Sequence, residues 1–468
     1  MTRWLAASLL VPLAACQAHL RAPAGLRSLG DEAEVFVYLR PLPPEAERLS
    51  IEVAGIAVVA VDGTEIPLHL RLSTVKRSQL AGERLFAVGR LPPGRYEGFA
   101  IRFASAAIAA EDGPAALLVS KEPSTAVLSW SAARGTATVV ALSLGYPPTV
   151  ERTFGFEPSL AALIPARPVP DTAALCSNAG MASLTIADRR TRNVAAVLPT
   201  GGSPRGLAID AAGRRIYVAA SDEDAVQVFD LASGSPLGRV RLSPGDRPWD
   251  LALAPDGRTL VVANAGSSTA SFVDVANLAE LRRVPTGETP SSVLLDRGGR
   301  RAYVLDRRAN AVTVLDVANR AVVTTVPTDP EPLHAALDAA GRRLYVVHAG
   351  SPYMTVLALP DLAPSARVFV GLGASTVLVD SRTDLVYVGR SDDRRLQVFD
   401  PFSLAPVSFV DVPAPVGVMA IDDAENTLWA LLPEARAVAV VDLTTRETLA
   451  VIDVGDAPAA LALTRARP

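Results

Sequence analysis

The sequence predicts an all-β protein in which an N-terminal β-sandwich precedes a seven-bladed β-propeller that is closed by both ends of its repeat region. Three observations predict this fold. The second part of the 468-residue chain repeats itself, each repeat holds four short runs that alternate with period 2, and the first part of the chain alternates in the same way. Apolar residues make up 49% of the chain and charged residues 20%, which excludes a mainly disordered protein.

A repeat with a period of 42 residues begins near Thr172. Its clearest marker is an aspartate that follows an alternating apolar run. This aspartate recurs at Asp188, Asp230, Asp274, Asp316, Asp400 and Asp442, and Ala358 takes its place in one further unit. The markers define seven units in residues 172–468. Because Asp accepts backbone N–H groups at strand-ending turns, copies at one repeat position indicate a scaffold residue rather than a catalyst.

Each unit contains four short β-type runs that are separated by turn residues. In one unit the runs are residues 292–295, 302–305, 311–315 and 322–326. They are too short for helices, and they alternate with period 2 rather than 3.6. Four short strands in each of seven units predict a seven-bladed β-propeller.

The repeat region begins in the middle of a unit. Its first run, residues 174–176, aligns with the second strand of the other units, and residues 459–463 at the far end align with the first, axial strand. We therefore expect the last blade to combine residues 459–463 with three strands from residues 173–199. Cys176 aligns with small apolar residues in the other units, so we expect its thiol to be buried and inert.

The units resemble the YVTN-type β-propeller repeats of bacterial and archaeal surface and periplasmic proteins. The segments that carry this resemblance are Tyr217-Val218-Ala219, Val262-Ala263-Asn264, Pro255-Asp256-Gly257 and the Gly-x-x-Pro of Gly287 to Pro290. The fifth unit departs most, because it has Ala358 and Ala374 in place of the repeated Asp and Pro. The resemblance implies the propeller fold and leaves the function open, since such propellers serve many roles.

Residues 1–15 are typical of a secretory leader, because Arg3 precedes an apolar stretch that is too short to span a membrane as a helix. The segment Leu13-Ala14-Ala15-Cys16 resembles the bacterial lipobox. This resemblance implies a lipoprotein signal peptide, acylation of Cys16, a lipidated tether at residues 16–33 and attachment to a membrane. Gln17 favours the outer membrane of the bacterial cell envelope, with the periplasmic or surface-facing side undecided. The alternative is an ordinary signal peptide with an incidental cysteine.

Residues 34–150 hold about eight alternating runs and are expected to form the β-sandwich domain. The segment Leu91-Pro92-Pro93-Gly94-Arg95-Tyr96 resembles a motif of transthyretin-like and immunoglobulin-like sandwiches in bacterial lipoproteins. This resemblance implies an adhesion or spacer module rather than an enzyme. Prolines are frequent after this domain, so residues 151–171 are expected to be a Pro-rich linker or a segment packed across the first domain.

Composition argues against several classes of function. A net charge of −4 disfavours a protein that neutralises nucleic-acid phosphates, and two Cys with four His exclude haem attachment and Cys-rich metal sites. We expect no metal and no cofactor, and we interpret the isolated His69 as structural. The sequence favours a lipid-anchored binding or scaffold protein that engages a protein or polymer partner, rather than an enzyme. The alternatives are a periplasmic enzyme of lactonase type and an accessory subunit of an envelope complex.

One candidate binding site follows from residues that differ between the repeats. The two residues after the proline of each Gly-x-x-Pro slot lie at the expected mouth of the central channel. Among them we single out Arg205, Trp249, Asp250, Ser292 and His334. Trp with Arg can hold an anionic or aromatic group, and a His near an Asp can respond to pH. The alternative is that these side chains only fill the channel mouth.

Overall fold

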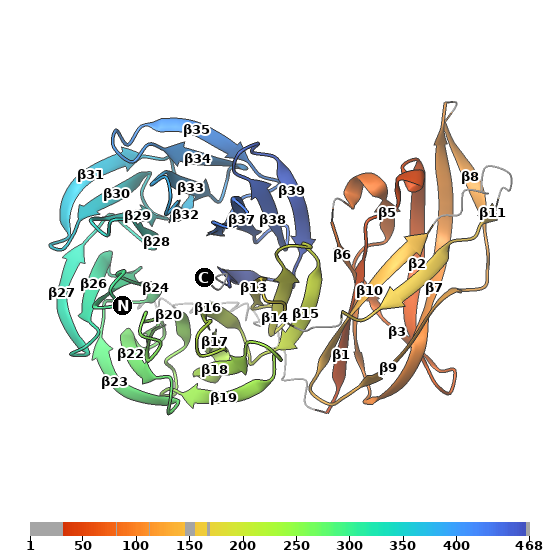
Figure 1. The fold of residues 1–468 in the computed structure, drawn as a ribbon, viewed down its shortest axis with the longest axis horizontal. Coiled ribbons are helices and arrows are strands. Elements are labelled where there is room, and N and C mark those ends of the chain that lie inside the picture. Colours follow the sequence, from red (N-terminus) through yellow and green to blue (C-terminus); the bar gives the residue numbers. More distant parts are fainter. Residues whose placement is uncertain (1–30, 81, 112, 146–154, 166–168, 465–468) are drawn as a thin grey trace, which may run out of the picture.

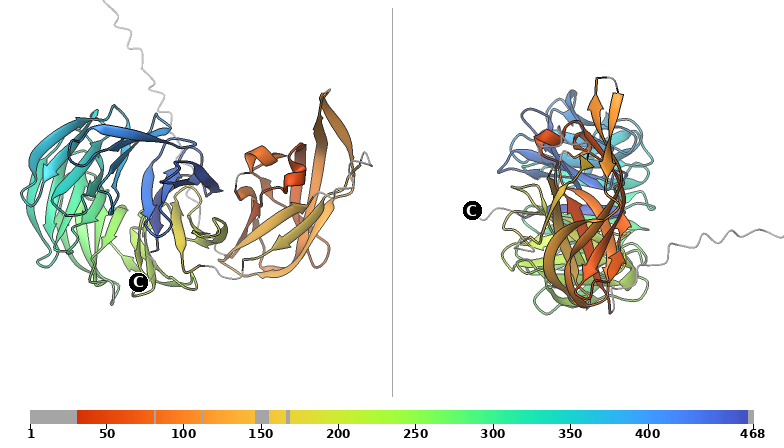
Figure 2. Two further views of the ribbon diagram at one scale, coloured as in Figure 1. Left: turned by 45° about the horizontal axis from the view of Figure 1, so that its top comes forward. Right: turned by 90° about the vertical axis from the view of Figure 1, so that its right-hand side faces the viewer.

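The computed structural model describes residues 31–80, 82–111, 113–145, 155–165 and 169–464. The chain is all-β, as predicted: apart from short 3₁₀ turns such as Pro44–Ala46, Arg77–Gln79 and Ser221–Glu223, the described elements are strands. A two-sheet domain lies beside a ring of seven sheets (Figures 1 and 2). The leader and Cys16 lie outside the described residues. Within those residues, no helix is long and apolar enough to cross a membrane.

The N-terminal domain is a sandwich of two sheets. One sheet has the order β12 (Ser159–Leu163), β10 (Ala137–Gly145), β1 (Ala33–Leu39), β6 (Arg84–Leu91) and β4 (His69–Leu70). The other has the order β11 (Gly155–Phe156), β8 (Gly113–Val119), β7 (Gly94–Ala110), β2 (Leu49–Ala60) and β3 (Glu65–Pro67); β5 (Thr74–Lys76) also pairs with β2, and β9 (Ser124–Ala132) with β7. Side chains from both sheets, among them Val35, Ile51, Phe99 and Val140, form one buried core.

The segment between the two domains contributes two strands to the sandwich. β12 pairs antiparallel with β10, and β11 pairs parallel with β8. The prolines at 158 and 165 fall outside these strands, where a missing backbone N–H breaks no ladder hydrogen bond. The sequence predicts either a Pro-rich linker or a packed segment for residues 151–171. Residues 155–163 form the second of these, a segment packed onto the first domain.

The ring is built from seven antiparallel four-stranded sheets. Three of these blades are β16 (Pro204–Asp210), β17 (Arg215–Ala220), β18 (Ala225–Asp230) and β19 (Pro236–Arg241); β20 (Pro248–Leu253), β21 (Thr259–Asn264), β22 (Thr269–Asp274) and β23 (Ala279–Pro285); and β24 (Pro290–Leu295), β25 (Arg301–Asp306), β26 (Ala311–Asp316) and β27 (Ala321–Pro327). Three more are β28 (Pro332–Leu337), β29 (Arg343–His348), β30 (Tyr353–Ala358) and β31 (Ala363–Phe369); β32 (Ala374–Val379), β33 (Val386–Arg390), β34 (Arg395–Phe399) and β35 (Pro406–Asp411); and β36 (Val418–Asp422), β37 (Thr427–Leu432), β38 (Ala437–Asp442) and β39 (Thr448–Asp453). The first strand of each blade faces the axis (Figure 1).

The seventh sheet, which we call the closing blade, joins the two ends of the repeat region. It has the order β15 (Val194–Pro199), β14 (Ser183–Asp188), β13 (Ala173–Asn178) and β40 (Pro458–Leu463). In the β13–β40 ladder, Ala174 pairs with Leu463 and Cys176 with Leu461. This confirms the predicted closure, in which the C-terminal strand supplies the axial strand of a blade whose other three strands begin the repeat region.

The repeated aspartates cap the turn between the third and fourth strands of their blades. The Oδ1 atom of Asp230, for example, accepts the backbone N–H of Ala232 at 3.1 Å and of Ser233 at 2.7 Å. The hydrogen bonds from Ser233 hold the pKa of Asp230 below its usual value. The scaffold interpretation of this repeat position is confirmed.

The sandwich and the ring share a hydrophobic core, which we call the interface core. Four sandwich residues, Phe36, Tyr38, Leu85 and Val139, belong to it and not to the core inside the sandwich. The closing blade and the neighbouring β36–β39 blade supply the rest, including the buried Cys176. The expected burial of Cys176 is confirmed, and this burial raises the pKa of its thiol.

Candidate functional site

The five residues proposed for the channel mouth separate into three groups. Arg205 with Trp249 forms the first, Asp250 with Ser292 the second, and His334 stands apart with a different partner. Trp249 and Asp250 are consecutive residues of β20, and side chains of consecutive strand residues point to opposite faces. The register of the β20–β21 ladder also shifts between Pro248 and Asp250, so Trp249 has no partner in this ladder.

Arg205 and Trp249 form a stacked pair. The guanidinium carbon of Arg205 lies 4.2 Å from the centroid of the Trp249 ring, within cation–π range. Trp249 is 37% exposed, whereas the Nε atom of Arg205 is buried and has no hydrogen-bond partner among the described residues. Burial lowers the pKa of Arg205, and Asp222 nearby partly opposes this effect. The pair thus presents an exposed indole beside a half-buried cation.

Asp250 joins two axial strands. Its Oδ2 atom accepts a hydrogen bond from the backbone N–H of Val293 on β24 at 2.9 Å. Its Oδ1 atom accepts one from the backbone N–H of the next residue, Leu251, at 2.9 Å. The hydroxyl of Ser292 also donates to this carboxylate. Burial raises the pKa of Asp250, although these hydrogen bonds oppose the shift. Gly206 leaves room for this carboxylate, because a Cβ there would lie 2.5 Å from Asp250 Oδ1. Asp250 and Ser292 therefore act as a tie between blades.

His334 makes the corresponding contact farther around the ring. Its Nδ1 atom lies 3.1 Å from the carbonyl oxygen of Val377 on the next axial strand. Burial lowers the pKa of His334, which favours a neutral ring that donates from Nδ1. Val377, rather than Asp250, is the hydrogen-bond partner that the structure gives this imidazole.

A cavity at the opposite end of the axial strands was not foreseen from the sequence. It has a volume of about 850 Å³, and its lining includes Leu253, Leu295, Leu378 and Leu463 at or near the ends of four axial strands. Arg189 also lines this cavity. It forms an ion pair of 2.8 Å with Asp422, and both side chains are buried. This pair ties the closing blade to the β36–β39 blade at the rim of the cavity.

The sequence carries a signal for this arginine. The positions equivalent to Arg189 in the other units hold apolar residues, namely Leu231, Val275, Val317, Leu359, Pro401 and Leu443. A single buried cation in a series of apolar residues points to a local partner, because an isolated buried charge is strongly destabilising. Only the fold reveals that this partner is Asp422, more than 200 residues away in the chain.

Two observations describe the chemistry that the described residues offer at the axis. Within those residues, no three His, Cys, Asp or Glu side chains are grouped so that they could hold a metal ion. The polar side chains at the channel mouth that have partners, Asp250 and His334, bind backbone groups of adjacent blades. The Arg205–Trp249 pair combines an exposed indole with a stacked cation, and it is the candidate contact site.

Comparisons with known proteins identify the fold. No protein-family model matches the sequence, and no curated protein does. Hydrazine synthase from Kuenenia stuttgartiensis is 17% identical with a TM-score of 0.54, over 59% of this chain and 94% of that chain. A functionally unknown protein from Desulfotomaculum acetoxidans is 12% identical with a TM-score of 0.55, over 63% of this chain and 99% of that one.

A third solved structure has the same kind of likeness. A putative 6-phosphogluconolactonase from Bacteroides uniformis is 16% identical with a TM-score of 0.52, over 63% of this chain and 100% of that chain. The resemblances to YVTN-type repeats, to transthyretin-like sandwiches and to the lipobox stay expectations from the sequence. At these identities the structural likeness shows the fold alone, and that fold is a β-propeller.

Proposed function

We propose that this protein is exported and anchored through Cys16 to a membrane of the bacterial cell envelope, where its propeller binds a protein or polymer partner. The observation that carries the binding part is the exposed Trp249 ring with Arg205 stacked on it at 4.2 Å. Trp and Arg are the residues most often responsible for binding energy at interfaces. The anchoring part rests on the sequence of residues 1–16.

The geometry of the pair suggests which group of the partner it contacts. Arg205 is only half-buried and places a positive charge beside the indole, so an anionic group of a partner is attracted to this pair. The indole offers an exposed apolar face beside this cation. The described part of the sandwich lies beside the ring and not over its axis (Figures 1 and 2).

The binding part is tested with two variants and one control. The partner is first captured by crosslinking in the native envelope, and its affinity is then measured for purified variants. Trp249→Ala and Arg205→Ala should each weaken binding by at least ~1 kcal/mol without a change in folding. Phe402→Ala is the control, because Phe402 is an aromatic residue that is 86% exposed in the turn before β35.

Affinities equal to wild type in both variants would remove this site from consideration. The search would then move to the loops between second and third strands, such as residues 222–224 and 392–395. An equal loss in Phe402→Ala would also count against the site, because it would indicate a non-specific effect of removing exposed aromatic surface.

The anchoring part has its own test. Cells that express the protein are grown with a radioactive fatty acid, and wild type is compared with Cys16→Ala. Label should appear in wild type and be lost in the variant, because the acyl chains are attached to this cysteine. Equal labelling of both proteins, or labelling of neither, would contradict the lipid anchor.

A further inference from the structure

We propose that the sandwich domain is a clamp that holds the closing blade together, and that this blade opens only when the sandwich separates from it. The closing blade is the one place in the ring where strands from distant parts of the chain must pair. Its axial strand β40 is joined to β13 by hydrogen bonds alone, with no covalent link between them. An opened propeller would expose unpaired strand edges, so this ladder requires protection.

Apolar contacts connect the sandwich to the whole width of this blade. The interface core includes Cys176 on β13, Ala187 on β14, Val194 on β15 and Leu461 on β40, so each of the four strands takes part. The sandwich contributes Phe36, Tyr38, Leu85 and Val139, which point away from its own core. These four side chains therefore have their partners in the ring.

Buried polar contacts reinforce the apolar ones. Glu83 of the sandwich is 1% exposed, and its Oε2 atom accepts the backbone N–H of Val194 on β15 at 3.0 Å. Its Oε1 atom pairs with Arg40 at 3.3 Å, which compensates the buried charge within the sandwich. The buried Tyr38 belongs to the interface core together with Ala187 on β14. The sandwich thus supplies partners to two strands of the closing blade.

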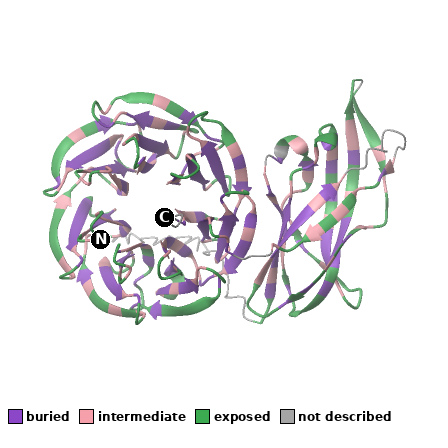
Figure 3. Cartoon of the chain, viewed as in Figure 1, coloured by how far each residue is buried: buried purple, intermediate pink, exposed green. Residues whose placement is uncertain are grey.

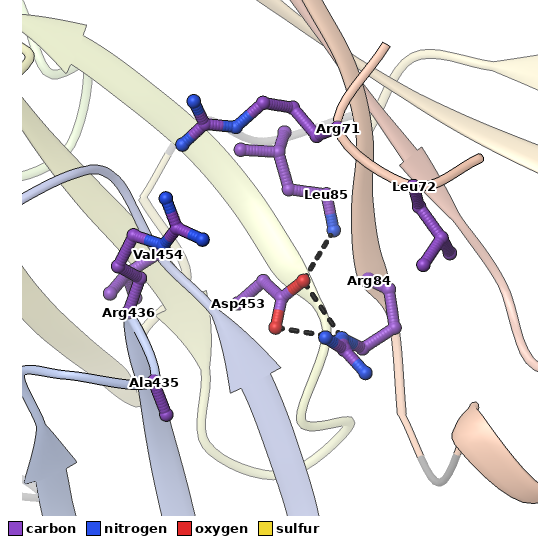
Figure 4. Close-up of a pocket in the computed structure, with 8 residues that line it drawn as sticks. All are labelled: Arg71, Leu72, Arg84, Leu85, Ala435, Arg436, Asp453 and Val454. Carbon is purple, nitrogen blue, oxygen red and sulfur yellow. Dashed lines mark hydrogen bonds and ion pairs between the residues drawn. The ribbon is translucent and has the colours of Figure 1, made fainter. Parts of the chain in front are cut away.

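The sandwich also holds the chain just before β40. Arg84 Nε lies 2.8 Å from both carboxylate oxygens of Asp453 on β39, and Leu85 N–H donates to Asp453 Oδ2 at 3.0 Å (Figure 4). Arg71 forms an ion pair with Asp456, two residues before β40 begins. A cavity of only about 70 Å³ remains between these residues. The segment that leads into the axial strand is therefore fixed at both of its ends.

Cys176 provides a built-in reporter for opening of the blade. It is 2% exposed in the interface core, and burial raises the pKa of its thiol, so a thiol reagent reaches it only when the blade or the interface opens. In the full chain carrying Cys16→Ser it is the only thiol, since the sequence has two cysteines. The rate of Cys176 labelling under native conditions then measures this opening.

The test compares two Leu→Ala substitutions in that background. Leu85→Ala weakens the interface core alone, whereas Leu305→Ala weakens the core of a blade on the β24–β27 side of the ring. We expect Leu85→Ala to speed labelling of Cys176 at least ~10-fold over the parent, and Leu305→Ala to change it less than about 2-fold. Equal rates in the two variants, or no increase in Leu85→Ala, would overturn the clamp.

A second measurement separates blade opening from a simple gap beside the thiol. β40 lies across the blade from the outermost strand β15, so a gap at Leu85 leaves its backbone hydrogen bonds intact. Hydrogen exchange of residues 458–463 should become faster in Leu85→Ala if the blade opens. Faster labelling without faster exchange in β40 would reject the proposal. If Leu85→Ala does not fold, Val139→Ala makes the same test with a smaller side chain of the interface core.

Discussion

The outer rim of the ring has a covered part and an open part, although the same repeat position forms both. In the open part, the fourth strands β19, β23, β27, β31 and β35 expose much of their outward face, with Leu237 at 51% and Phe369 at 68% exposure. In the covered part, Val194 and Val197 on β15 and Ala450 on β39 are buried in the interface core. Figure 3 shows this contrast between the exposed outer strands and β15.

The contrast shows that the burial of a repeat position depends on what lies outside the repeat. β19 reads PLGRVR and carries two arginines, whereas β15 reads VAAVLP and carries no charge. A strand that is apolar on both faces is typical of a strand with a layer on each side. The outermost strand of the closing blade therefore has the sequence of an interior strand, because the sandwich supplies its second layer.

The largest effect is expected from removing the strand that closes the ring. Deletion of residues 456–468 takes away β40 and leaves β13 as an unpaired edge in the covered part of the molecule. We expect the free energy of unfolding to fall by several kcal/mol, with a clear drop in the melting temperature. An unchanged melting temperature would refute the closure. It would also show that the covered rim is no more sensitive to loss of a strand than the open rim.

The same substitution can be made at a sandwich leucine that covers the rim and at a leucine on the open rim. Leu85→Ala removes a side chain that is 4% exposed in the interface core and should destabilise the protein by about 2–5 kcal/mol. Leu237→Ala on the open rim should change stability by less than about 0.5 kcal/mol. Chemical denaturation measures both. Equal values would show that the sandwich contact contributes nothing to stability.

Loss of an ion pair should also cost more stability on the covered part of the rim than on the open part. Arg84→Ala leaves the largely buried Asp453 without its arginine and should cost about 1–3 kcal/mol at neutral pH. Arg367→Ala breaks a 2.7 Å pair with Asp329 on the open rim, where Arg367 is exposed, and should cost less than about 1 kcal/mol. A larger loss in Arg367→Ala would reverse the expected order.

The cost of Arg84→Ala should also depend on pH. Burial raises the pKa of Asp453 and Arg84 lowers it, so loss of Arg84 raises the pKa of the folded state further. A carboxyl whose folded pKa is raised binds its proton more tightly when folded, and it lowers stability only where the unfolded chain is ionised. The cost should therefore grow as the pH rises through the folded wild-type pKa of Asp453, which lies above its usual value of about 4, and shrink below it. A cost that is constant with pH would exclude Asp453 as the group responsible.

The sequence by itself determined the ring. The period of the repeat, its four short runs and the incomplete first unit were sufficient to predict seven blades and a closing blade built from both ends, because strand pairing within each unit is local. The turn aspartates and the buried Cys176 followed from their repeat positions for the same reason. The stacking of Arg205 on Trp249 followed only in part, since the sequence grouped them with three residues that have other partners.

Only the tertiary structure decided which residues meet across long distances in the chain. Glu83 and Val194, Arg84 and Asp453, and Arg189 and Asp422 each come from different blades or domains, and no periodic pattern relates their positions. Periodicity reports which face of a strand is apolar, but it carries no information on which surface will cover that face. The docking of the sandwich on the closing blade therefore appears only when both folds are complete and their unpartnered apolar faces meet.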